Sequence, residues 1–406
     1  MRRTTTILLT GLISLLSFHA VATAAEKPLK VYILAGQSNM QGHAHVRTFD
    51  HIGMDTRTAP ILKEMRAADG THRVCDNVWI SSLGSAAEQR QGKLTAGFGA
   101  AGGGPKIGPE FTFGIYMQKL VDEPILIIKT AWGGKSLHTD FRPPSAGPYE
   151  FNEQQLKRLK EQGKDIAAAR EDRAKVTGHY YQLMMEHVNK VLKDIKRVYP
   201  GYDAKAGYEL VGFVWFQGWN DMVDRGVYPN RGNPAGYDQY SEVLAHFIRD
   251  VRKDLAAPNM PLVIGVLGVG GPIEKYGPDQ QRYKGIHGEF RKAMAAPAAM
   301  PEFEGNVTAV LTERYWDLEL TELAARWDKV RAKSRSLNQD KSLSGDQRKK
   351  ALDAFTADTF TAKELKIFRA GTSNAAYHYM GSAKIMAQIG KAFAEAVAET
   401  SKTIGE

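Results

Sequence analysis

The sequence predicts an α/β protein with a central, parallel, five-stranded sheet that helices cover on both faces. Short apolar runs recur along the chain, at residues 31–35, 125–129, 210–216, 262–267 and 307–311. Amphipathic, helix-like segments lie between these runs, and such alternation is typical of a parallel sheet buried on both faces. Because ligands bind at the carboxyl ends of parallel strands, the turns that follow the runs are candidate sites.

The N-terminal residues predict an exported protein. Arg2 and Arg3 precede an apolar run over residues 7–16, and Ala22-Thr23-Ala24 has the small-residue pattern of a cleavage site. The apolar run is too short to cross a bilayer. We therefore interpret residues 1–24 as a signal peptide and expect a secreted or periplasmic protein with no membrane span.

The mature chain, residues 25–406, is predicted to form a single domain. Its length and a hydrophobic content of 43% allow a large core. Two polar, charge-rich segments, at about 141–175 and 318–370, predict insertions outside that core. Cys75 is the only cysteine, so we expect no internal disulfide and a buried thiol.

Charge and histidine content argue against nucleic-acid and metal partners. The formal net charge is +9, and two of these charges belong to the signal peptide. Basic and acidic residues are interleaved, which is typical of an ordinary solvated surface. His43 and His45 are one pair without a third ligand, so solvated loop histidines are expected and no cofactor or metal. Residues 97–102 spell G-x-G-x-x-G but lack the flanking strand and helix of a dinucleotide site.

The first strand ends in a candidate nucleophile. Residues 31–35 run straight into Gly36-Gln37-Ser38. A buried strand fixes the backbone, and glycine permits the tight turn that presents the Ser38 hydroxyl. A helix after the turn would direct N–H groups at an anion formed there. A purely structural serine in this turn is the open alternative.

The second and third strands contribute further polar groups at this edge. Gly133-Gly134 follows the strand at 125–129, and residues 217–221, Gln-Gly-Trp-Asn-Asp, follow the strand at 210–216. Between the two strands, an apolar stripe over residues 181–198 predicts an amphipathic helix.

The last part of the chain completes the sheet and adds a histidine. A helix over residues 240–255 leads to the fourth strand, and the fifth is followed by Glu313 and Asp317. His378 lies just before the final helix, whose apolar stripe spans residues 385–397.

These groups fit the requirements of acyl transfer, which are a nucleophile, a base and donors for the oxyanion. Ser38 is the candidate nucleophile and His378 the candidate base. The Ser38 N–H, the Gly134 N–H and the Asn220 side chain are candidate oxyanion donors. Taken singly, His378 fits a polar helix start, Gly134 a turn and Asn220 a helix cap. Their common position at strand ends favours catalysis.

The motifs together resemble the four sequence blocks of the SGNH hydrolase superfamily. The blocks are Gly36-Gln37-Ser38-Asn39-Met40, Gly134-Lys135-Ser136, Gly218-Trp219-Asn220-Asp221 and the late His378. The first block, with Gly108-Pro109-Glu110, is similar to the sialate O-acetylesterase and acetylxylan esterase branch, which is carbohydrate esterase family 6-like. The resemblance spans nearly the whole mature chain except the two predicted insertions.

This resemblance implies a fold, a reaction and a set of roles. The fold would be a flavodoxin-like, three-layer α/β/α sandwich, and the reaction the hydrolysis of acetyl esters on sugars without a metal or other cofactor. Ser38 would be the nucleophile and His378 the general base. The Ser38 N–H, the Gly134 N–H and the Asn220 side chain would form the oxyanion hole.

The resemblance also implies which residues meet the substrate, an acetylated carbohydrate. Gln37 and Gln217 would lie beside the site. Trp132 and Trp219 could form an apolar wall for the acetyl group or for a sugar face, and burial in the core is the alternative for both.

One departure from the family concerns the acid that orients the histidine. The family usually has an aspartate three residues before the histidine, and here this position is Ala375. Asn374 is adjacent but carries no charge. Asp317 is the preferred replacement, and Glu313 or a backbone carbonyl that holds His378 are the alternatives.

The same departure leaves a second function open, a weakened or inactive enzyme that binds glycans on this scaffold. A lipase-like esterase ranks third, because no dense apolar loop near the motifs would build an acyl channel.

Overall fold

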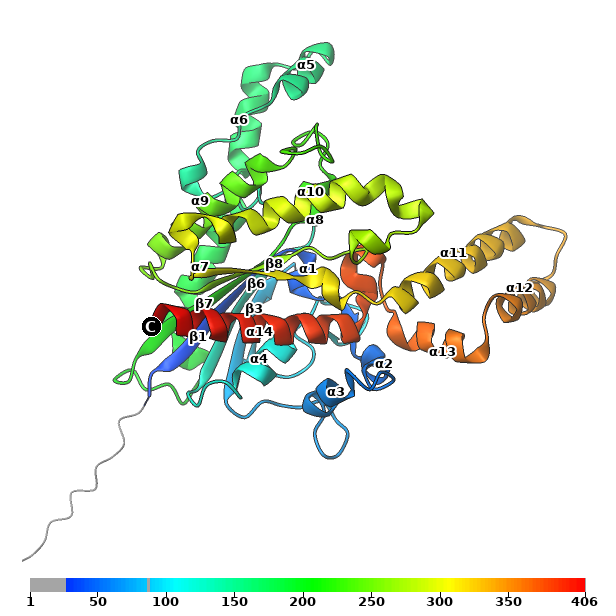
Figure 1. Cartoon of the computed structure of the whole chain (residues 1–406), viewed down its shortest axis with the longest axis horizontal. Coiled ribbons are helices and arrows are strands. Elements are labelled where there is room, and N and C mark those ends of the chain that lie inside the picture. Colours follow the sequence, from blue (N-terminus) through cyan, green and yellow to red (C-terminus); the bar gives the residue numbers. More distant parts are fainter. Residues whose placement is uncertain (1–26, 86–87, 406) are drawn as a thin grey trace, which may run out of the picture.

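The computed structural model describes residues 27–85 and 88–405, and the predicted signal peptide lies outside this part of the chain. A sheet in the order β4-β3-β6-β1-β7-β8-β9 forms its centre (Figure 1). The strands are β1 (Leu29–Gly36), β3 (Val78–Gly84), β4 (Arg90–Lys93), β6 (Ile125–Ala131), β7 (Tyr208–Phe216), β8 (Leu262–Val266) and β9 (Val307–Leu311). The predicted α/β class is confirmed, but the sheet has seven strands rather than five.

The two additional strands are β3 and β4. β3 pairs in parallel with β6, and β4 pairs antiparallel with β3 at the edge of the sheet. The polar sequence of β4, Arg-Gln-Gly-Lys, suits an edge strand that faces water on one side and explains why no apolar run marked it. A separate pair, β2 (Ala44–His45) with β5 (Lys106–Ile107), lies outside this sheet.

Helices cover both faces of the sheet and give three layers (Figure 1). Successive strand residues point to opposite faces, so Trp215 packs on Phe247 of α9 while Phe216 packs on Phe393 of α14. One layer contains α4 (Glu110–Met117) and α14 (Ala383–Gly405), and the other contains α7 (His179–Lys193), α9 (Asp238–Asp254) and α10 (Lys284–Ala295). No helix within residues 27–85 and 88–405 has the length and apolarity of a membrane span.

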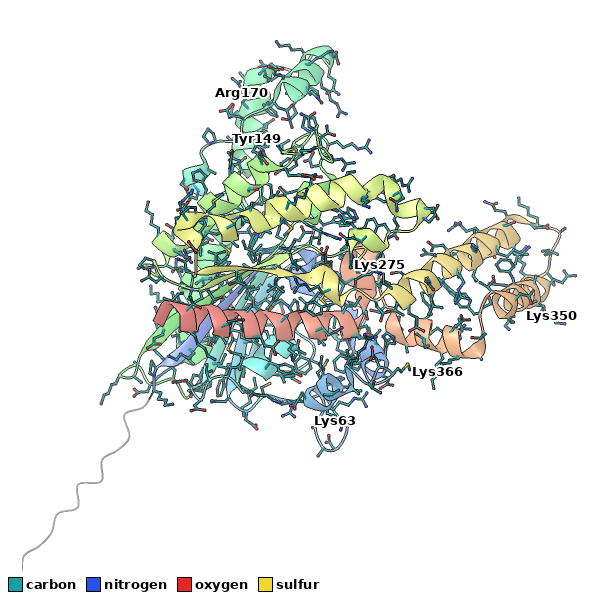
Figure 2. All side chains as sticks on the ribbon, in the orientation of Figure 1. Lys63, Tyr149, Arg170, Lys275, Lys350 and Lys366 are labelled. Atoms are coloured by element: carbon teal, nitrogen blue, oxygen red, sulfur yellow. The ribbon has the colours of Figure 1, made fainter. Side chains whose placement is uncertain are left out.

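Two helical arms project from this body, at the predicted insertions (Figure 1). The first arm consists of α5 (Glu153–Glu161) and α6 (Ile166–Val176), and the second of α11 (Leu318–Gln339), α12 (Gly345–Thr359) and α13 (Ala362–Gly371). Lys350 and Lys366 of the second arm point away from the sheet into solvent (Figure 2). Capping boxes at Asn152, Ser344 and Thr361 begin α5, α12 and α13.

Short helices occupy the loops around the carboxyl ends of the strands. They are α1 (Ser38–Gln41), α2 (Phe49–Ile52), α8 (Trp219–Val223) and the 3₁₀ turn η9 (Ala376–Gly381). Another short helix, α3 (Ala59–Met65), packs beside α2 and α4.

The strand register explains where a site can form. Gly36, at the end of β1, is level with Ala131 of β6 and with Phe216 of β7. The chain leaves β1 toward β3 and β6 on one side and later returns to β7 on the other, so β1 is the point at which the strand order switches. The three loops that follow β1, β6 and β7 therefore meet.

Gly36 has no room for a side chain at this point. Its φ is +155°, and the backbone of Phe216 lies so close that a Cβ on residue 36 would be 2.1 Å from the Phe216 carbonyl oxygen. Glycine is therefore required for β1 and β7 to end side by side.

Candidate active site

A cavity of about 530 Å³ lies at the carboxyl ends of β1, β6 and β7. Its lining includes six of the predicted site residues, which are Gln37, Ser38, Gly134, Trp219, Asn220 and His378. The other lining residues are Gln41, His43, Ser85, Ala100, Ala101, Gly133 and Tyr377. The fold thus brings together side chains that are 340 positions apart in the sequence (378 minus 38).

Ser38 is the first residue of α1, directly after the turn at the end of β1. Only 7% of it is exposed. Its carbonyl accepts a hydrogen bond from the Gly42 N–H at 2.9 Å, and Gln37 Nε2 lies 3.4 Å from its Oγ. Strand and helix together hold the hydroxyl at the cavity wall.

The orientation of the Gln37 amide determines that of Asn220. Gln37 Oε1 accepts from the backbone N–H of Gly218 at 3.0 Å, and a backbone nitrogen can only donate. The other end of the amide, Nε2, therefore donates to Asn220 Oδ1 at 3.1 Å. This bond directs the Asn220 NH₂ away from Gln37, so that it is available as a donor to the cavity.

Gln217 lies below the cavity and connects the loops that form it. Its Nε2 donates to Gln37 Oε1 at 3.2 Å, to the Lys135 carbonyl at 3.0 Å and to Asp221 Oδ2 at 2.6 Å. Tyr240 OH donates to Gln217 Oε1 at 3.1 Å. Gln217 is therefore a buried support of the site, with its amide hydrogen bonds directed to other protein groups.

Asp221 is a structural contributor that the sequence showed only as part of a motif. Its fully buried carboxylate accepts the N–H groups of Leu137 at 2.8 Å and His138 at 2.9 Å. These bonds hold the loop that contains Gly134, whose φ of +75° suits glycine. Burial raises the pKa of Asp221 to about 6, and the hydrogen bonds oppose this shift.

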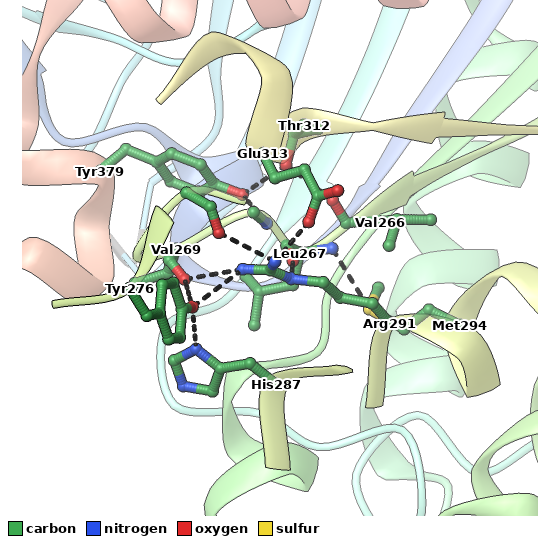
Figure 3. A network of polar contacts seen from close by, with 12 residues as sticks. Val266, Leu267, Val269, Tyr276, His287, Arg291, Met294, Thr312, Glu313 and Tyr379 are labelled. Carbon is green, nitrogen blue, oxygen red and sulfur yellow. Dashed lines mark hydrogen bonds and ion pairs between the residues drawn. The ribbon is translucent and has the colours of Figure 1, made fainter. Parts of the chain in front are cut away.

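The loop that carries His378 is fixed by its next residue, Tyr379. The Tyr379 ring is fully buried, and its hydroxyl accepts the Gly268 N–H at 2.8 Å and lies 2.6 Å from Thr312 Oγ1 (Figure 3). Tyr379 and Met380 both have a positive φ, at +51° and +57°. Two successive residues rarely adopt this conformation without glycine, so tertiary contacts impose the shape of this loop.

The hydrogen bonds of Asn374 define the protonation of His378. Asn374 Oδ1 accepts the Ala375 N–H at 2.7 Å, which identifies this atom as the amide oxygen. The same oxygen lies 3.0 Å from His378 Nδ1, so Nδ1 carries the ring proton and Nε2 is left unprotonated. Burial lowers the pKa of His378 to about 4, so the ring is neutral at pH 7.

The contacts of Asp317 correct its expected role. Asp317 Oδ2 is paired with Lys384 at 3.0 Å, and Oδ1 caps α11 through the Leu320 N–H at 3.0 Å. It lines a different cavity, beside α11 and α14. A carboxylate that begins a helix and neutralises a buried lysine cannot also hold the imidazole. Asn374, the uncharged neighbour, contacts Nδ1 instead.

Glu313, the alternative acid, also has another partner. It pairs with Arg291, which is buried and donates to the carbonyls of Leu267 and Val269 at 2.9 and 3.0 Å (Figure 3). This network fixes the loop after β8, against which Tyr379 packs.

Among the aromatic groups near the cavity, His43 differs from expectation, and the two tryptophans take different ones of the two positions expected for them. His43, expected in a solvated loop, stacks on His378 with a centroid distance of 3.8 Å and parallel rings. Trp219 pairs with the half-exposed Tyr377 at 5.7 Å, whereas Trp132 packs in the core against Phe141. Burial in the core, the alternative for Trp132, is what the structure has. Nothing in the sequence around His43 distinguishes it from a surface histidine.

Metal ligands do not gather at this site. Across residues 27–85 and 88–405, no group of three or more histidine, cysteine, aspartate or glutamate side chains is placed to hold an ion.

The chain is similar to one family of carbohydrate esterases and to several solved structures. The family model described as "Carbohydrate esterase, sialic acid-specific acetylesterase" matches residues 28–299. A protein from Arabidopsis thaliana is 18% identical, with a TM-score of 0.38, over 70% of this chain and 86% of that one. NanS is 11% identical, with a TM-score of 0.39, over 71% and 78%.

A carbohydrate acetylesterase from Xanthomonas citri is 12% identical, with a TM-score of 0.36, over 69% of this chain and 49% of that one. This chain thus spans about half the length of the Xanthomonas protein. A search of curated proteins gives no match.

Proposed function

Because this chain belongs to the sialic acid-specific acetylesterase family of carbohydrate esterases, we propose that it hydrolyses O-acetyl esters on sugars with Ser38 as the nucleophile. The observation that carries the proposal is the state of His378. Its Nδ1 proton is directed to Asn374, and the ring lines the same cavity as Ser38. An unprotonated Nε2 in the cavity that also holds the serine hydroxyl is what a general base requires.

In the first half of the proposed reaction, Ser38 Oγ attacks the carbonyl carbon of the acetyl group, and its proton passes to His378 Nε2. The negative charge that develops on the carbonyl oxygen is held by the N–H groups of Ser38 and Gly134 and by the Asn220 NH₂. The Gln37–Asn220 hydrogen bond supports this role, because it turns the NH₂ toward the cavity before substrate arrives. His378 then protonates the sugar oxygen that leaves.

In the second half, a water molecule attacks the acetyl-serine carbonyl while His378 again accepts the proton. When the second tetrahedral intermediate collapses, the bond from the acyl carbon to Ser38 Oγ breaks, acetate leaves, and His378 returns the proton to Ser38 Oγ. Trp219, beside Tyr377 at the cavity, supports a sugar-binding wall, because aromatic rings offer an apolar surface for the apolar face of a sugar.

The Ser38→Ala variant tests the proposal. We expect it to release no acetate from p-nitrophenyl acetate or from an acetylated glycan, while its circular dichroism spectrum and Tm match those of the wild type. A fluorophosphonate probe should label the wild type and not the variant. Acetate release that is independent of Ser38 would refute the proposed nucleophile.

Asn374 favours a second candidate, a glycan-binding protein with a weakened active site. An uncharged amide supports the imidazolium less than a carboxylate does. Under this alternative the purified protein binds acetylated glycans in calorimetry, and neither acetate release nor probe labelling depends on Ser38.

We further infer that the protein is exported, on the basis of the sequence of residues 1–24. Mass spectrometry of protein from the native host would then find a mature N-terminus near Ala25.

A further inference from the structure

His43 contacts the proposed base in a way that its sequence position does not suggest. Its ring lies parallel to the ring of His378, with the centroids 3.8 Å apart. Both rings line the same cavity. His378 therefore has a hydrogen bond at one edge, from Nδ1 to Asn374, and an aromatic ring against one face.

These two contacts restrict different motions of His378. A single hydrogen bond to Nδ1 fixes the position of one ring atom but allows the ring to tilt about the line to Asn374. A flat ring in van der Waals contact prevents that tilt. Together they keep Nε2 directed to one place, which is what a base must do for proton transfer.

His43 is itself held firmly. It directly precedes β2, which pairs with β5. Ser373 Oγ accepts the His45 N–H at 3.1 Å and donates to the Gly381 carbonyl at 2.7 Å. Ser373 thus joins the strand after His43 to both ends of the loop that carries His378.

The surroundings of His43 keep its ring neutral at pH 7. Burial lowers the pKa of His43 to about 4, and repulsion from a charged His378, from Lys106 and from Lys129 adds to this shift. On its own loop His378 has two tyrosine neighbours, Tyr379, which is buried, and Tyr377, whose ring meets it edge-on with the centroids 4.5 Å apart. When His378 receives the proton of Ser38, its cation thus meets the face of a neutral ring, and a cation is attracted to such a face.

We propose that His43 is a positioning residue for the esterase reaction: its stacked ring holds His378 in place and supports the charged imidazolium, a task that a carboxylate performs in the usual triad. The inference rests on the proposed function, because it assumes that His378 is the base. It assigns to His43 no proton transfer of its own.

Substitutions that separate ring shape from ring chemistry test this inference. His43→Leu removes the aromatic face but keeps an apolar side chain of similar size, and we expect kcat on p-nitrophenyl acetate to fall about tenfold with KM within about twofold. His43→Phe restores a flat aromatic face without nitrogen, and we expect kcat within about threefold of the wild type. His45→Leu, two residues away and outside the cavity, is the matched control and should leave kcat unchanged.

Histidine ring NMR in the Ser38→Ala protein gives a readout that needs no activity. We expect His43→Leu to shift the His378 Cε1–H resonance by loss of the ring current, and His43→Phe to retain most of that effect. If His43→Leu unfolds, His43→Gln replaces it in both experiments.

The outcomes distinguish this inference from the proposed function. An unchanged kcat in His43→Leu, an unchanged His378 resonance, or a loss in His43→Phe as large as in His43→Leu would each overturn the role of the stack. Absence of Ser38-dependent acetate release in the wild type, with the expected resonance shifts, would instead overturn the proposed reaction and keep the stacked geometry.

Discussion

At the scale of single residues, the site is ordered by backbone groups whose direction is unambiguous. The Gly218 N–H defines the amide of Gln37, and the Ala375 N–H defines the amide of Asn374. Each amide then determines the atom that its neighbour presents, which is the NH₂ of Asn220 in one case and Nε2 of His378 in the other. The Asn220 NH₂, a donor, and His378 Nε2, an acceptor, are thus oriented before any substrate binds.

The pKa of His378 predicts how activity depends on pH. Burial lowers this pKa to about 4, so the base is unprotonated at pH 5 and above and is lost only as the pH falls through about 4. We expect the acid limb of kcat/KM for p-nitrophenyl acetate near pH 4. A limb near pH 6.5 would show that water reaches the ring freely.

Asn374→Asp tests the role of the missing acid. A carboxylate within hydrogen-bonding distance of Nδ1 favours the charged imidazolium, so the pKa of His378 should rise, and the acid limb should move to higher pH by about one unit. We also expect kcat at pH 7 to rise by about tenfold, because the cation formed in the transition state is better stabilised.

Asn374→Ala is the control for this change, since it removes the oxygen that orients Nδ1. Its kcat should fall below that of the wild type. An acid limb that stays in place in Asn374→Asp would mean that residue 374 does not interact with the base.

At the scale of elements, the sequence predicted the strands that carry long apolar runs and the helices with an apolar stripe. It also predicted which loops meet, since Ser38, Gly134 and Asn220 follow strands that end level with one another. β4 was missed because an edge strand needs no apolar run. The roles of His43, Asn374 and Asp317 depend on contacts between distant loops, which no local pattern records.

Lys129 is another residue whose contacts the local sequence pattern does not reveal, and it lies within a strand. It ends the apolar run of β6, yet only 1% of its side chain is exposed. Its Nζ binds Glu110 Oε2 at 2.7 Å, the Gln41 carbonyl at 2.9 Å and the Phe98 carbonyl at 3.1 Å. The ammonium therefore ties the end of α1, which begins with Ser38, to α4.

Removal of one partner of this ion pair should destabilise the fold strongly. In Lys129→Met, Glu110 becomes a buried charge without its cation, and we expect a loss of about 3–5 kcal/mol in the free energy of unfolding, measured in urea. The double variant Lys129→Met with Glu110→Gln should recover part of this loss. A single variant as stable as the wild type would show that water reaches Glu110.

At the scale of the whole molecule, the catalytic candidates belong to the layered body and not to the arms. The cavity is lined by residues from the loops after β1, β3, β6 and β7, from the loop between β4 and β5 and from the loop before α14. The two arms differ in how they are attached. α5 and α6 contain no buried residues, whereas α11 buries Leu320, Leu323, Val330 and Leu337.

Replacement of residues 151–176 by a short Gly-Ser linker tests whether the first arm is separable from the site. Glu150 and Thr177 line one cavity, so the two ends of the arm lie close enough to be joined. The losses are the packing of Arg173 on the Tyr149 ring at 4.7 Å and the hydrogen bonds from Asn152 Nδ2 to the Gly226 carbonyl at 2.8 Å and from Gln155 Nε2 to the Tyr149 hydroxyl at 2.7 Å, each of which is a modest term. We expect a Tm within about 4 °C of the wild type and an unchanged kcat/KM on p-nitrophenyl acetate.

The matched comparison is the removal of the second arm, residues 318–371, by a linker of the same composition. That deletion exposes the surface on which the apolar side chains of α11 pack and removes the helix that Asp317 caps, so we expect a protein that unfolds at a much lower temperature or does not fold. Loss of activity on the small ester after removal of the first arm alone would contradict a site that the body builds by itself. Activity retained on p-nitrophenyl acetate but lost on an acetylated polysaccharide would assign that arm to the binding of the longer substrate.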